Sequence, residues 1–172
     1  ARQISELGSW VITSPDTPPS GAILEPSPTE ITEWIAGIGP LGISVDIETA
    51  GKHIIMVGMC RVDDLVPICI HFLRQGGSAY WSAHDWGGVR TQLADLLADP
   101  SVSKVFHNGQ AFDIPILEAN GFPVAGYDFD TLLAQHIAYA EMPKSLEFCA
   151  KVYLGEGGWK HILGDDSEGE WK

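Results

Sequence analysis

Residues 41–73, LGISVDIETAGKHIIMVGMCRVDDLVPICIHFL, decide the fold. They hold three runs rich in branched apolar residues, at Leu41–Thr49, His53–Val62 and Val66–Leu73. The connectors between these runs are at most three residues long. Strands joined so closely pair in antiparallel fashion, because a parallel connection needs a crossover of roughly a dozen residues or more. We therefore predict an antiparallel meander of three strands.

Upstream of the meander, the sequence predicts an irregular lead-in and one helix. Residues 1–26 are rich in proline and have no regular pattern. Ser27-Pro28-Thr29-Glu30 then combines an N-cap, a proline at the first helical position and a capping-box glutamate. We expect a short helix that ends near Gly37 and Gly39, at the start of a single domain spanning residues 27–172.

Downstream of the meander, helical and strand patterns alternate. Apolar spacing, caps and helix-breaking residues mark four helices, with two short β-like runs between them. The expected elements are a helix at Val89–Leu97, a strand at Ser103–Phe106, a helix at Gln110–Asn120, a strand at Val124–Tyr127, and helices at Thr131–Tyr139 and Ser145–Tyr153. Together with the meander they predict an α/β fold, a mixed sheet flanked by helices, and this order resembles the ribonuclease-H-like architecture.

Composition and charge restrict the classes of function. The 172 residues suffice for one domain with a sizeable core, and 45% of them are hydrophobic. The formal net charge is −13 with only ten Lys and Arg, which argues against a protein that coats nucleic acid by neutralising its backbone. A nuclease stays open, because bound divalent cations can mediate the contact with phosphate.

Cysteine usage and the lack of an apolar leader indicate an intracellular protein. Cys60, Cys69 and Cys149 lie inside apolar runs without close pairing, which favours buried structural thiols over disulfides or a metal site. No basic start precedes an apolar stretch at the N-terminus, and no apolar run is long enough to span a bilayer. We expect a soluble, cytoplasmic protein of bacterial or phage type that has no membrane partner.

Two carboxylates lie near the end of the first predicted strand. Asp46 and Glu48 are two residues apart, and strand alternation places both on the same face. Like charges this close repel unless a cation lies between them, and hard divalent cations prefer such oxygen ligands. For this pair alone, two solvated acids at a strand end are the simpler explanation.

A third carboxylate follows a later strand. In VFHNGQAFDIPIL, residues 105–117, the strand ends at Phe106 and Asp113 comes in the first turns of the next helix. A carboxylate at that position can reach toward the mouth of the sheet. For Asp113 alone, an acid that complements the helix dipole is again the simpler explanation.

Three stretches together resemble a known family. SVDIET, residues 44–49, resembles the first exonuclease motif of the DEDD superfamily, and HNGQAFD, residues 107–113, matches its second, Asn-x-x-x-Phe-Asp. FDTLLAQHIAYAEMPKSLEFCAKVYLG, residues 129–155, resembles the segment that follows in family A DNA polymerases, particularly those of phages. The resemblance covers about Leu41 to Trp159, and the ordered set is more specific than any single motif.

The resemblance implies a proofreading-type 3′→5′ exonuclease that hydrolyses the terminal phosphodiester of DNA and releases 5′-mononucleotides. Asp46, Glu48 and Asp113 would be the catalytic residues and the ligands of two divalent cations, Mg²⁺ or Mn²⁺. Thr49 and Asn108 would help to seat the terminal nucleotide. The implied partners are the 3′ end of single-stranded DNA and the remainder of a DNA polymerase chain.

Three further residues near the motifs receive expected roles. For Phe112, a substrate contact is one interpretation, and a core anchor that aims Asp113 is the preferred one. His107 is expected to be a structural histidine beside the strand end. Asp130 matches the Asp-Thr position of the family, where we expect a helix N-cap and not a metal ligand.

The superfamily's fourth carboxylate belongs to a third motif, either Tyr-x-x-x-Asp or His-x-x-x-x-Asp. The tyrosine version is absent, because Gly157 stands four residues after Tyr153. His161 and Asp166 have the spacing of the histidine version, but the residues around them make a poor helix. We therefore expect the chain to end before its third motif, with metal binding by Asp166 and His161 as the alternative.

Two other functions stay open. A ribonuclease D-like enzyme that trims RNA would share the same metals and motifs. A ribonuclease-H-like module that binds a partner and catalyses nothing would fit the low basic content and the missing third motif, because a fold alone does not establish a function.

Overall fold

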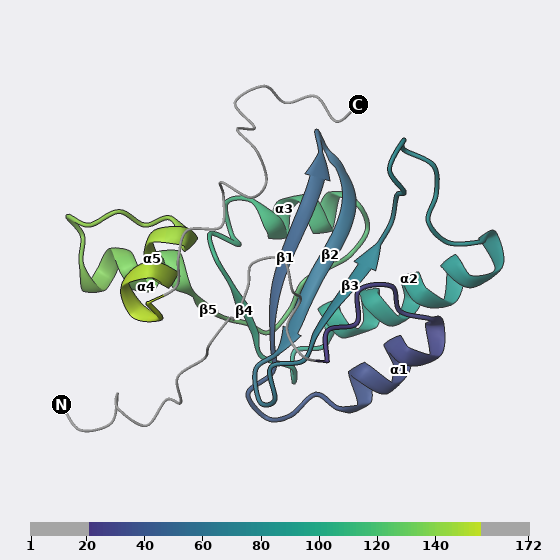
Figure 1. The fold of residues 1–172 in the computed structure, drawn as a ribbon, viewed down its shortest axis with the longest axis horizontal. Helices are drawn as coiled ribbons and strands as arrows, with labels where there is room; N and C mark the ends of the chain where they lie inside the picture. Colours follow the sequence, from purple (N-terminus) through teal and green to yellow (C-terminus); the bar gives the residue numbers. More distant parts are fainter. Residues whose placement is uncertain (1–20, 156–172) are drawn as a thin grey trace.

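The computed structural model describes residues 21–155 of the chain. Most of the predicted lead-in, residues 1–20, and the alternative third motif at His161 and Asp166 lie outside the described residues. The predicted α/β fold is confirmed, because one mixed five-stranded sheet is flanked by helices (Figure 1).

The sheet has the strand order β3-β2-β1-β4-β5. The strands are β1 (Ile43–Ala50), β2 (His53–Arg61), β3 (Pro67–His71), β4 (Lys104–Phe106) and β5 (Tyr127–Asp130). The first three pair in antiparallel fashion, which confirms the predicted meander. β4 pairs in parallel with β1, and β5 in parallel with β4. The first strand of the meander is therefore the central strand of the sheet.

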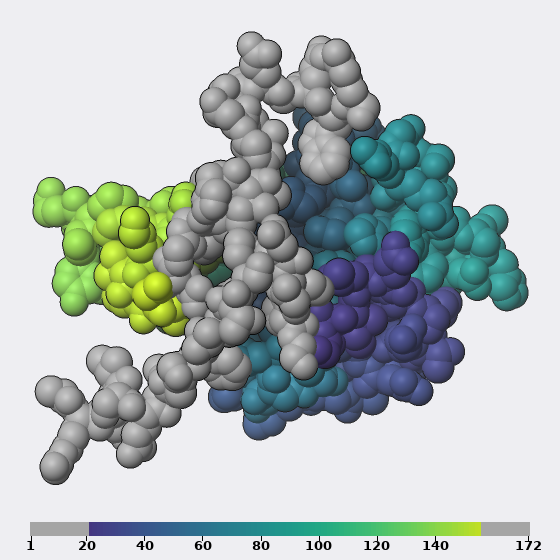
Figure 2. Space-filling view, in the orientation of Figure 1, coloured from purple at the N-terminus to yellow at the C-terminus, as the bar shows by residue number. Residues whose placement is uncertain are grey.

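Helices pack around and beyond this sheet. They are α1 (Pro28–Ala36), α2 (Ala83–Ala98), α3 (Asp113–Ala119), α4 (Thr131–Ala138) and α5 (Leu146–Tyr153). α1 packs on α2, α3 contacts β2, and α4 and α5 lie together beyond β5 (Figure 1). In the space-filling view α4 and α5 form the left-hand end of the molecule (Figure 2). Among the described helices, none has both the length and the apolar character needed to cross a membrane.

Serine caps set the starts of the first two helices. Ser27 accepts a hydrogen bond from the N–H of Glu30, whose carboxylate accepts one from the N–H of Ser27, so the predicted capping box is present. Ser82 caps α2, which therefore begins more than a turn before its predicted start. The sequence did not predict this first part of α2, because it contains Gly87 and Gly88 and glycine is a poor helix former.

The fifth strand is displaced from its prediction. β5 begins at Tyr127, where the predicted strand ends. Gly126 has a φ of 70°, and a Cβ on it would lie 2.4 Å from the carbonyl oxygen of Val102. The chain thus approaches β4 through a tight glycine turn, and parallel pairing begins only after it, with Tyr127 opposite Lys104.

The core packs against one face of the sheet. On the central strand, Ile43, Val45 and Ile47 are buried, which leaves the alternate residues of β1 to the opposite face. The largest buried apolar side chains elsewhere are Trp34, Phe106, Phe122, Ile31, Leu93 and Leu97. The apolar face of the sheet is therefore covered, and Asp46 and Glu48 lie on the other face of β1.

The cysteines are free thiols, as predicted. Cys149 is buried, and Cys60 and Cys69 are half-buried. Burial raises the pKa of the Cys60 and Cys69 thiols, which keeps them protonated and unreactive near neutral pH. Their contribution is to packing.

Candidate active site

Asp46 and Glu48 share the outward face of the central strand. Both are exposed, whereas Val45 and Ile47 on the opposite face are buried. The two carboxylates therefore lie on one face, as alternation predicts. Thr49, the next residue of β1, is half-buried, and the register between β1 and β2 shifts between Glu48 and Thr49.

Asp113 reaches the same strand from the start of α3. The N–H of Ile43 points toward β4 and donates to Ser103 O at 2.9 Å, and by alternation the N–H of Ile47 points toward the same edge. β4 ends at Phe106, so this edge of β1 is left open at Ile47. Asp113 Oδ1 accepts the hydrogen bond from Ile47 at 3.2 Å, and the side chain is only 2% exposed.

The charge of Asp46 acts on the other two carboxyl groups. Burial raises the pKa of Asp113 to about 6, and the charge of Asp46 contributes to the increase. Partial burial also raises the pKa of Asp46, although this side chain keeps contact with solvent. The pKa of Glu48 is raised by burial and by the charge of Asp46. A cation among these groups would favour their charged forms and lower all three pKa values.

His107 lies within electrostatic reach of Asp46. Its Nδ1 is 2.7 Å from Thr131 Oγ1, and that hydroxyl donates to Phe106 O at 3.3 Å. Which of His107 and Thr131 donates in the shorter contact depends on the tautomer of the imidazole. A positive charge on His107 opposes the burial that raises the pKa of Asp46. The half-buried, anchored ring fits the structural role predicted for it.

Asn108 lies in a turn that Asp130 holds. Asn108 has a φ of 67°, a left-handed conformation that asparagine tolerates better than most residues. The carboxylate of Asp130 accepts hydrogen bonds from the N–H groups of Asn108 at 3.0 Å and Gly109 at 2.8 Å. It also caps α4 through the N–H groups of Leu132 and Leu133, which confirms the predicted N-cap. The contacts with the turn were not predicted, because they join residues more than twenty positions apart.

The interpretation of Phe112 as a core anchor is wrong. Its side chain is 45% exposed, whereas the core phenylalanines, Phe106 and Phe122, are buried. α3 begins at Asp113, so Phe112 occupies the N-cap position and only Asp113 turns inward. Phe112 therefore lies at the surface, directly before Asp113 in the chain.

The donor atoms of the candidate site are of the kind that hard cations bind. Asp46, Glu48 and Asp113 offer carboxylate oxygens, and Ile47 engages only Oδ1 of Asp113 among the hydrogen bonds of the described residues. Across residues 21–155, no three His, Cys, Asp or Glu side chains are already gathered closely enough to enclose a metal ion. The carboxylates therefore form an open site, and water or substrate oxygens would have to complete a coordination shell.

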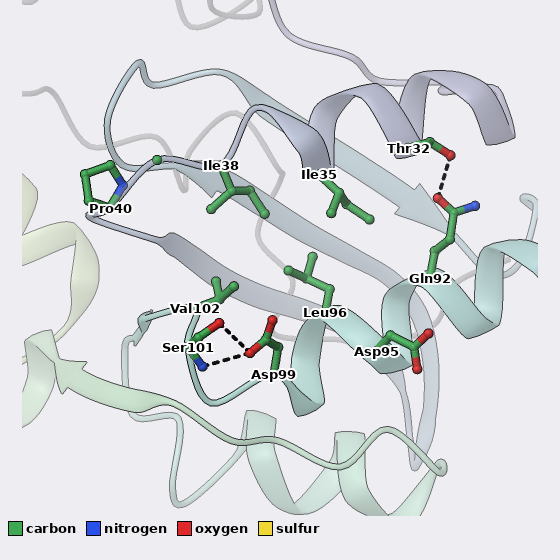
Figure 3. Close-up of a pocket in the computed structure, with 11 residues that line it drawn as sticks. Thr32, Ile35, Ile38, Pro40, Gln92, Asp95, Leu96, Asp99, Ser101 and Val102 are labelled. Carbon is green, nitrogen blue, oxygen red and sulfur yellow. Dashed lines mark hydrogen bonds between the residues drawn. The ribbon is translucent and has the colours of Figure 1, made fainter.

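A cleft of about 670 Å³ lies elsewhere, between α1 and α2 (Figure 3). Ile35, Ile38 and Leu96 project into it, and the Asp99 carboxylate on its wall accepts hydrogen bonds from the N–H and hydroxyl of Ser101. None of the predicted site residues lines this cleft. Its acids are set among apolar side chains, and Asp99 is already engaged, so the chemistry is better placed at β1.

Comparison with solved structures identifies proteins of similar fold. The POL domain of Pol1 from M. smegmatis, in complex with DNA primer-template and dNTP, is 22% identical with a TM-score of 0.58, over 79% of this chain and 23% of that chain. RNase D of Trypanosoma brucei, in complex with RNA U12, is 16% identical with a TM-score of 0.56, over 78% of this chain and 47% of that chain. NrnC of Brucella melitensis is 18% identical with a TM-score of 0.56, over 87% of this chain and 64% of that chain.

These likenesses are structural and partial. No protein-family model matches the chain, and no curated protein does so either. The chain spans less than two thirds of the length of each of these solved chains. At sequence identities of 16% to 22%, these comparisons show a similar fold and nothing further. The chain has the ribonuclease-H-like fold found in the DEDD superfamily, the family that its two motifs resemble.

Proposed function

We propose that this chain is a 3′→5′ exonuclease domain that hydrolyses the terminal phosphodiester of DNA with the help of two divalent cations. One observation carries the proposal: the hydrogen bond from Ile47 N–H to Asp113 Oδ1 brings the second motif to the strand that bears Asp46 and Glu48. Residues 66 positions apart in sequence thereby meet at one point of the sheet. Either motif alone would be weak evidence.

Asp46, Glu48 and Asp113 would hold the cations, Mg²⁺ or Mn²⁺. Burial raises the pKa of all three groups, and the charge of Asp46 adds to the increase at Glu48 and Asp113. Their charged forms therefore carry an electrostatic cost that a cation would offset. When bound, two such ions supply positive charge to the attacking and leaving oxygens of a phosphodiester. NrnC of Brucella melitensis has been solved with bound Mg²⁺ in a similar fold, which supports this assignment.

Thr49, Asn108 and Phe112 would receive the terminal nucleotide. The backbone of Asn108 is held in its turn by Asp130, five residues before Asp113. The exposed ring of Phe112 offers a surface on which a base can stack, a contact that does not depend on sequence. The chain's few basic residues need not neutralise a long stretch of backbone if only the last nucleotides are bound.

DNA is the proposed substrate, and RNA is the second candidate. Residues 129–155 resemble family A polymerases, and Pol1 of M. smegmatis, whose POL domain was solved with DNA primer-template, shares the fold. RNase D of Trypanosoma brucei, solved with RNA U12, shares it equally well. The proposed partners are the 3′ end of single-stranded DNA and the remainder of a DNA polymerase chain.

A fourth carboxylate would complete the metal site. We propose that it belongs to a third motif C-terminal to Lys172, which predicts weak activity for residues 1–172 alone. The alternative is that His161 and Asp166 supply it. Replacing Asp166 by Ala separates the two, because weak activity should persist in the first case and a robust activity should be abolished in the second.

The test of the proposed function uses matched single-stranded DNA and RNA oligonucleotides labelled at the 3′ or the 5′ end. With Mg²⁺ we expect slow release of 5′-mononucleotides from the 3′ end of DNA, abolished by EDTA. Degradation of RNA with DNA left intact would favour the ribonuclease D-like alternative. If calorimetry shows that neither Mg²⁺ nor Mn²⁺ binds, the chain is a binding module and the proposal fails.

A further inference from the structure

Asp130 joins three segments of the fold through its two carboxylate oxygens. Oδ1 accepts hydrogen bonds from the N–H groups of Asn108 at 3.0 Å and Leu132 at 2.8 Å. Oδ2 accepts from the N–H of Gly109 at 2.8 Å and from the hydroxyl of Tyr127 at 3.1 Å. The residue is 5% exposed, so these contacts are shielded from water.

The network is that of a charged acceptor. Burial alone would raise the pKa of Asp130, but the hydrogen bonds from Asn108, Gly109, Leu133 and Leu132 outweigh it and lower the pKa. The group is therefore a carboxylate at neutral pH. Hydrogen bonds to an ionised acceptor are stronger than neutral ones, so the contacts hold their donors firmly.

Helix capping explains only half of this arrangement. The cap of α4 uses Oδ1, through the N–H groups of Leu132 and Leu133. Among the hydrogen bonds of the described residues, Oδ2 makes none with α4 and instead engages Gly109 and Tyr127. Serine or asparagine would serve equally well as a cap. The second oxygen of Asp130 thus has a use outside α4, at the turn that follows β4.

That turn leads directly into the candidate site. Gly109 O accepts a hydrogen bond from the N–H of Ile114, and Asn108 O accepts one from the N–H of Phe112, so the turn is coupled to both neighbours of Asp113. The turn is also tightly packed, because a Cβ on Gly109 would lie 2.5 Å from Phe106 Cβ. A shift of Gly109 would therefore move the start of α3 and the carboxylate of Asp113.

We propose that Asp130 is a positioning residue: it holds the turn at Asn108 through Oδ1 and at Gly109 through Oδ2, and thereby sets where Asn108 and Asp113 meet the nucleotide and the metal. The inference rests on the proposed function for its kinetic consequences. The structural part of the proposal, that the Asp130 carboxylate holds this turn, does not depend on any activity.

Two substitutions separate positioning from capping. Asp130→Asn keeps one oxygen for the α4 cap but turns an amide N–H toward the N–H of Gly109, where two donors face each other. Asp130→Ser keeps a capping hydroxyl that is too short to span to Gly109. The matched control is Asp128→Asn, an exposed acid two residues away whose carboxylate contacts only the hydroxyl of Ser103 among the described residues.

The measurements are amide resonances, thermal midpoints and steady-state kinetics on the full chain. We expect Asp130→Asn and Asp130→Ser to move the Gly109 amide resonance and to speed its hydrogen exchange. The oligonucleotide KM and the half-saturating Mg²⁺ concentration should both rise, and kcat/KM should fall about tenfold, the loss of one charged hydrogen bond. Asp128→Asn should match the wild type in every measurement.

The outcomes distinguish this proposal from the proposed function. A purely structural role would lower the thermal midpoint and leave the KM and Mg²⁺ dependence of the folded protein unchanged, and that result would overturn the proposal. An unmoved Gly109 resonance in Asp130→Asn would overturn it as well. If the wild type releases no mononucleotide, the exonuclease assignment fails, while the amide measurements still decide whether Asp130 controls the turn.

Discussion

Asp113 accepts a hydrogen bond from the backbone N–H of Ile47 at 3.2 Å, at the one position of β1 that separates Asp46 from Glu48. The contact exists because β4 is short: its pairing with β1 stops before Ile47, and Asp113 takes the place of a further strand residue. The buried carboxylate thus takes the place of the strand carbonyl that would otherwise accept the hydrogen bond from Ile47. Burial, together with the nearby charge of Asp46, raises the pKa of this carboxyl to about 6.

The charge on Asp113 should make the metal-free protein less stable as pH rises. Its carboxyl has a pKa of about 6 in the fold against 3.8 as reference, so the folded state binds the extra proton between these values. The unfolding free energy contributed by this group is highest below about pH 3.8 and is lost as pH rises from there through 6. The loss is about 2 to 3 kcal/mol.

Asp113→Asn tests this dependence, since Asn keeps an oxygen for Ile47 and removes the charge. In EDTA, the variant should melt with the wild type near pH 4 and at a higher temperature at pH 7.5. A difference that is constant across this range would contradict the raised pKa. In the wild type, calorimetric Mg²⁺ affinity should fall as pH drops below about 6, because protons then compete for the ligand.

Asp46→Asn should leave the metal-free protein as stable as the wild type or more stable. Burial is the larger cause of the raised pKa of Glu48 and Asp113, and removing the charge of Asp46 relieves the repulsion that adds to it. Mg²⁺ binding should be lost at the same time. The check is a thermal melt in EDTA with Asp95→Asn, an exposed acid on α2, as control. Clear destabilisation by Asp46→Asn in EDTA would count against a metal site.

Gly109→Ala should destabilise the protein by about 1 to 3 kcal/mol, because the new Cβ would overlap Phe106 in the turn before Asp113. Gly88→Ala is the matched control. That glycine lies exposed in α2 with no atom near its missing Cβ, so alanine should stabilise the helix by about 0.5 to 1 kcal/mol. Denaturant unfolding measures both, and a neutral Gly109→Ala would show that the turn is looser than described.

Phe112→Ala should change stability little and weaken substrate binding. A side chain that is 45% exposed contributes little to the core, so the unfolding free energy should stay within about 0.5 kcal/mol of the wild type. Loss of a stacked base should weaken single-stranded oligonucleotide binding by about 1 to 3 kcal/mol. Anisotropy titrations measure the affinity. A large loss of stability with unchanged affinity would restore the core-anchor interpretation.

The fold was largely predictable because its strands carry strong local signals. The meander, the capping box and the Asp130 cap all follow from neighbouring residues, and all are present in the structure. The fifth strand was displaced because its start depends on the Gly126 turn fitting against Val102, a contact between distant segments. Local patterns carry no information about such a fit.

The carboxylates of the candidate site could be predicted from the sequence, but the contacts that hold them in place could not. Asp46 and Glu48 follow from alternation, but burial of Asp113 and exposure of Phe112 depend on where α3 begins. That start is set by the turn at Gly109 and its contact with Asp130, residues separated by a helix and a strand. Lys104 is a similar case: its amine is buried against the carbonyl oxygens of Asp99 and Val102, which no pattern of charges indicated.

The most direct test of the account is the Mg²⁺-dependent release of 5′-mononucleotides from a 3′-labelled single-stranded DNA by the wild type, Asp113→Asn and Asp95→Asn. The wild type and Asp95→Asn should release mononucleotides slowly and at equal rates, with release stopped by EDTA. Asp113→Asn should release none above background, because the carboxylate that joins the two motifs is gone. Equal rates for Asp113→Asn and the wild type would contradict the claim that these motifs form one active site.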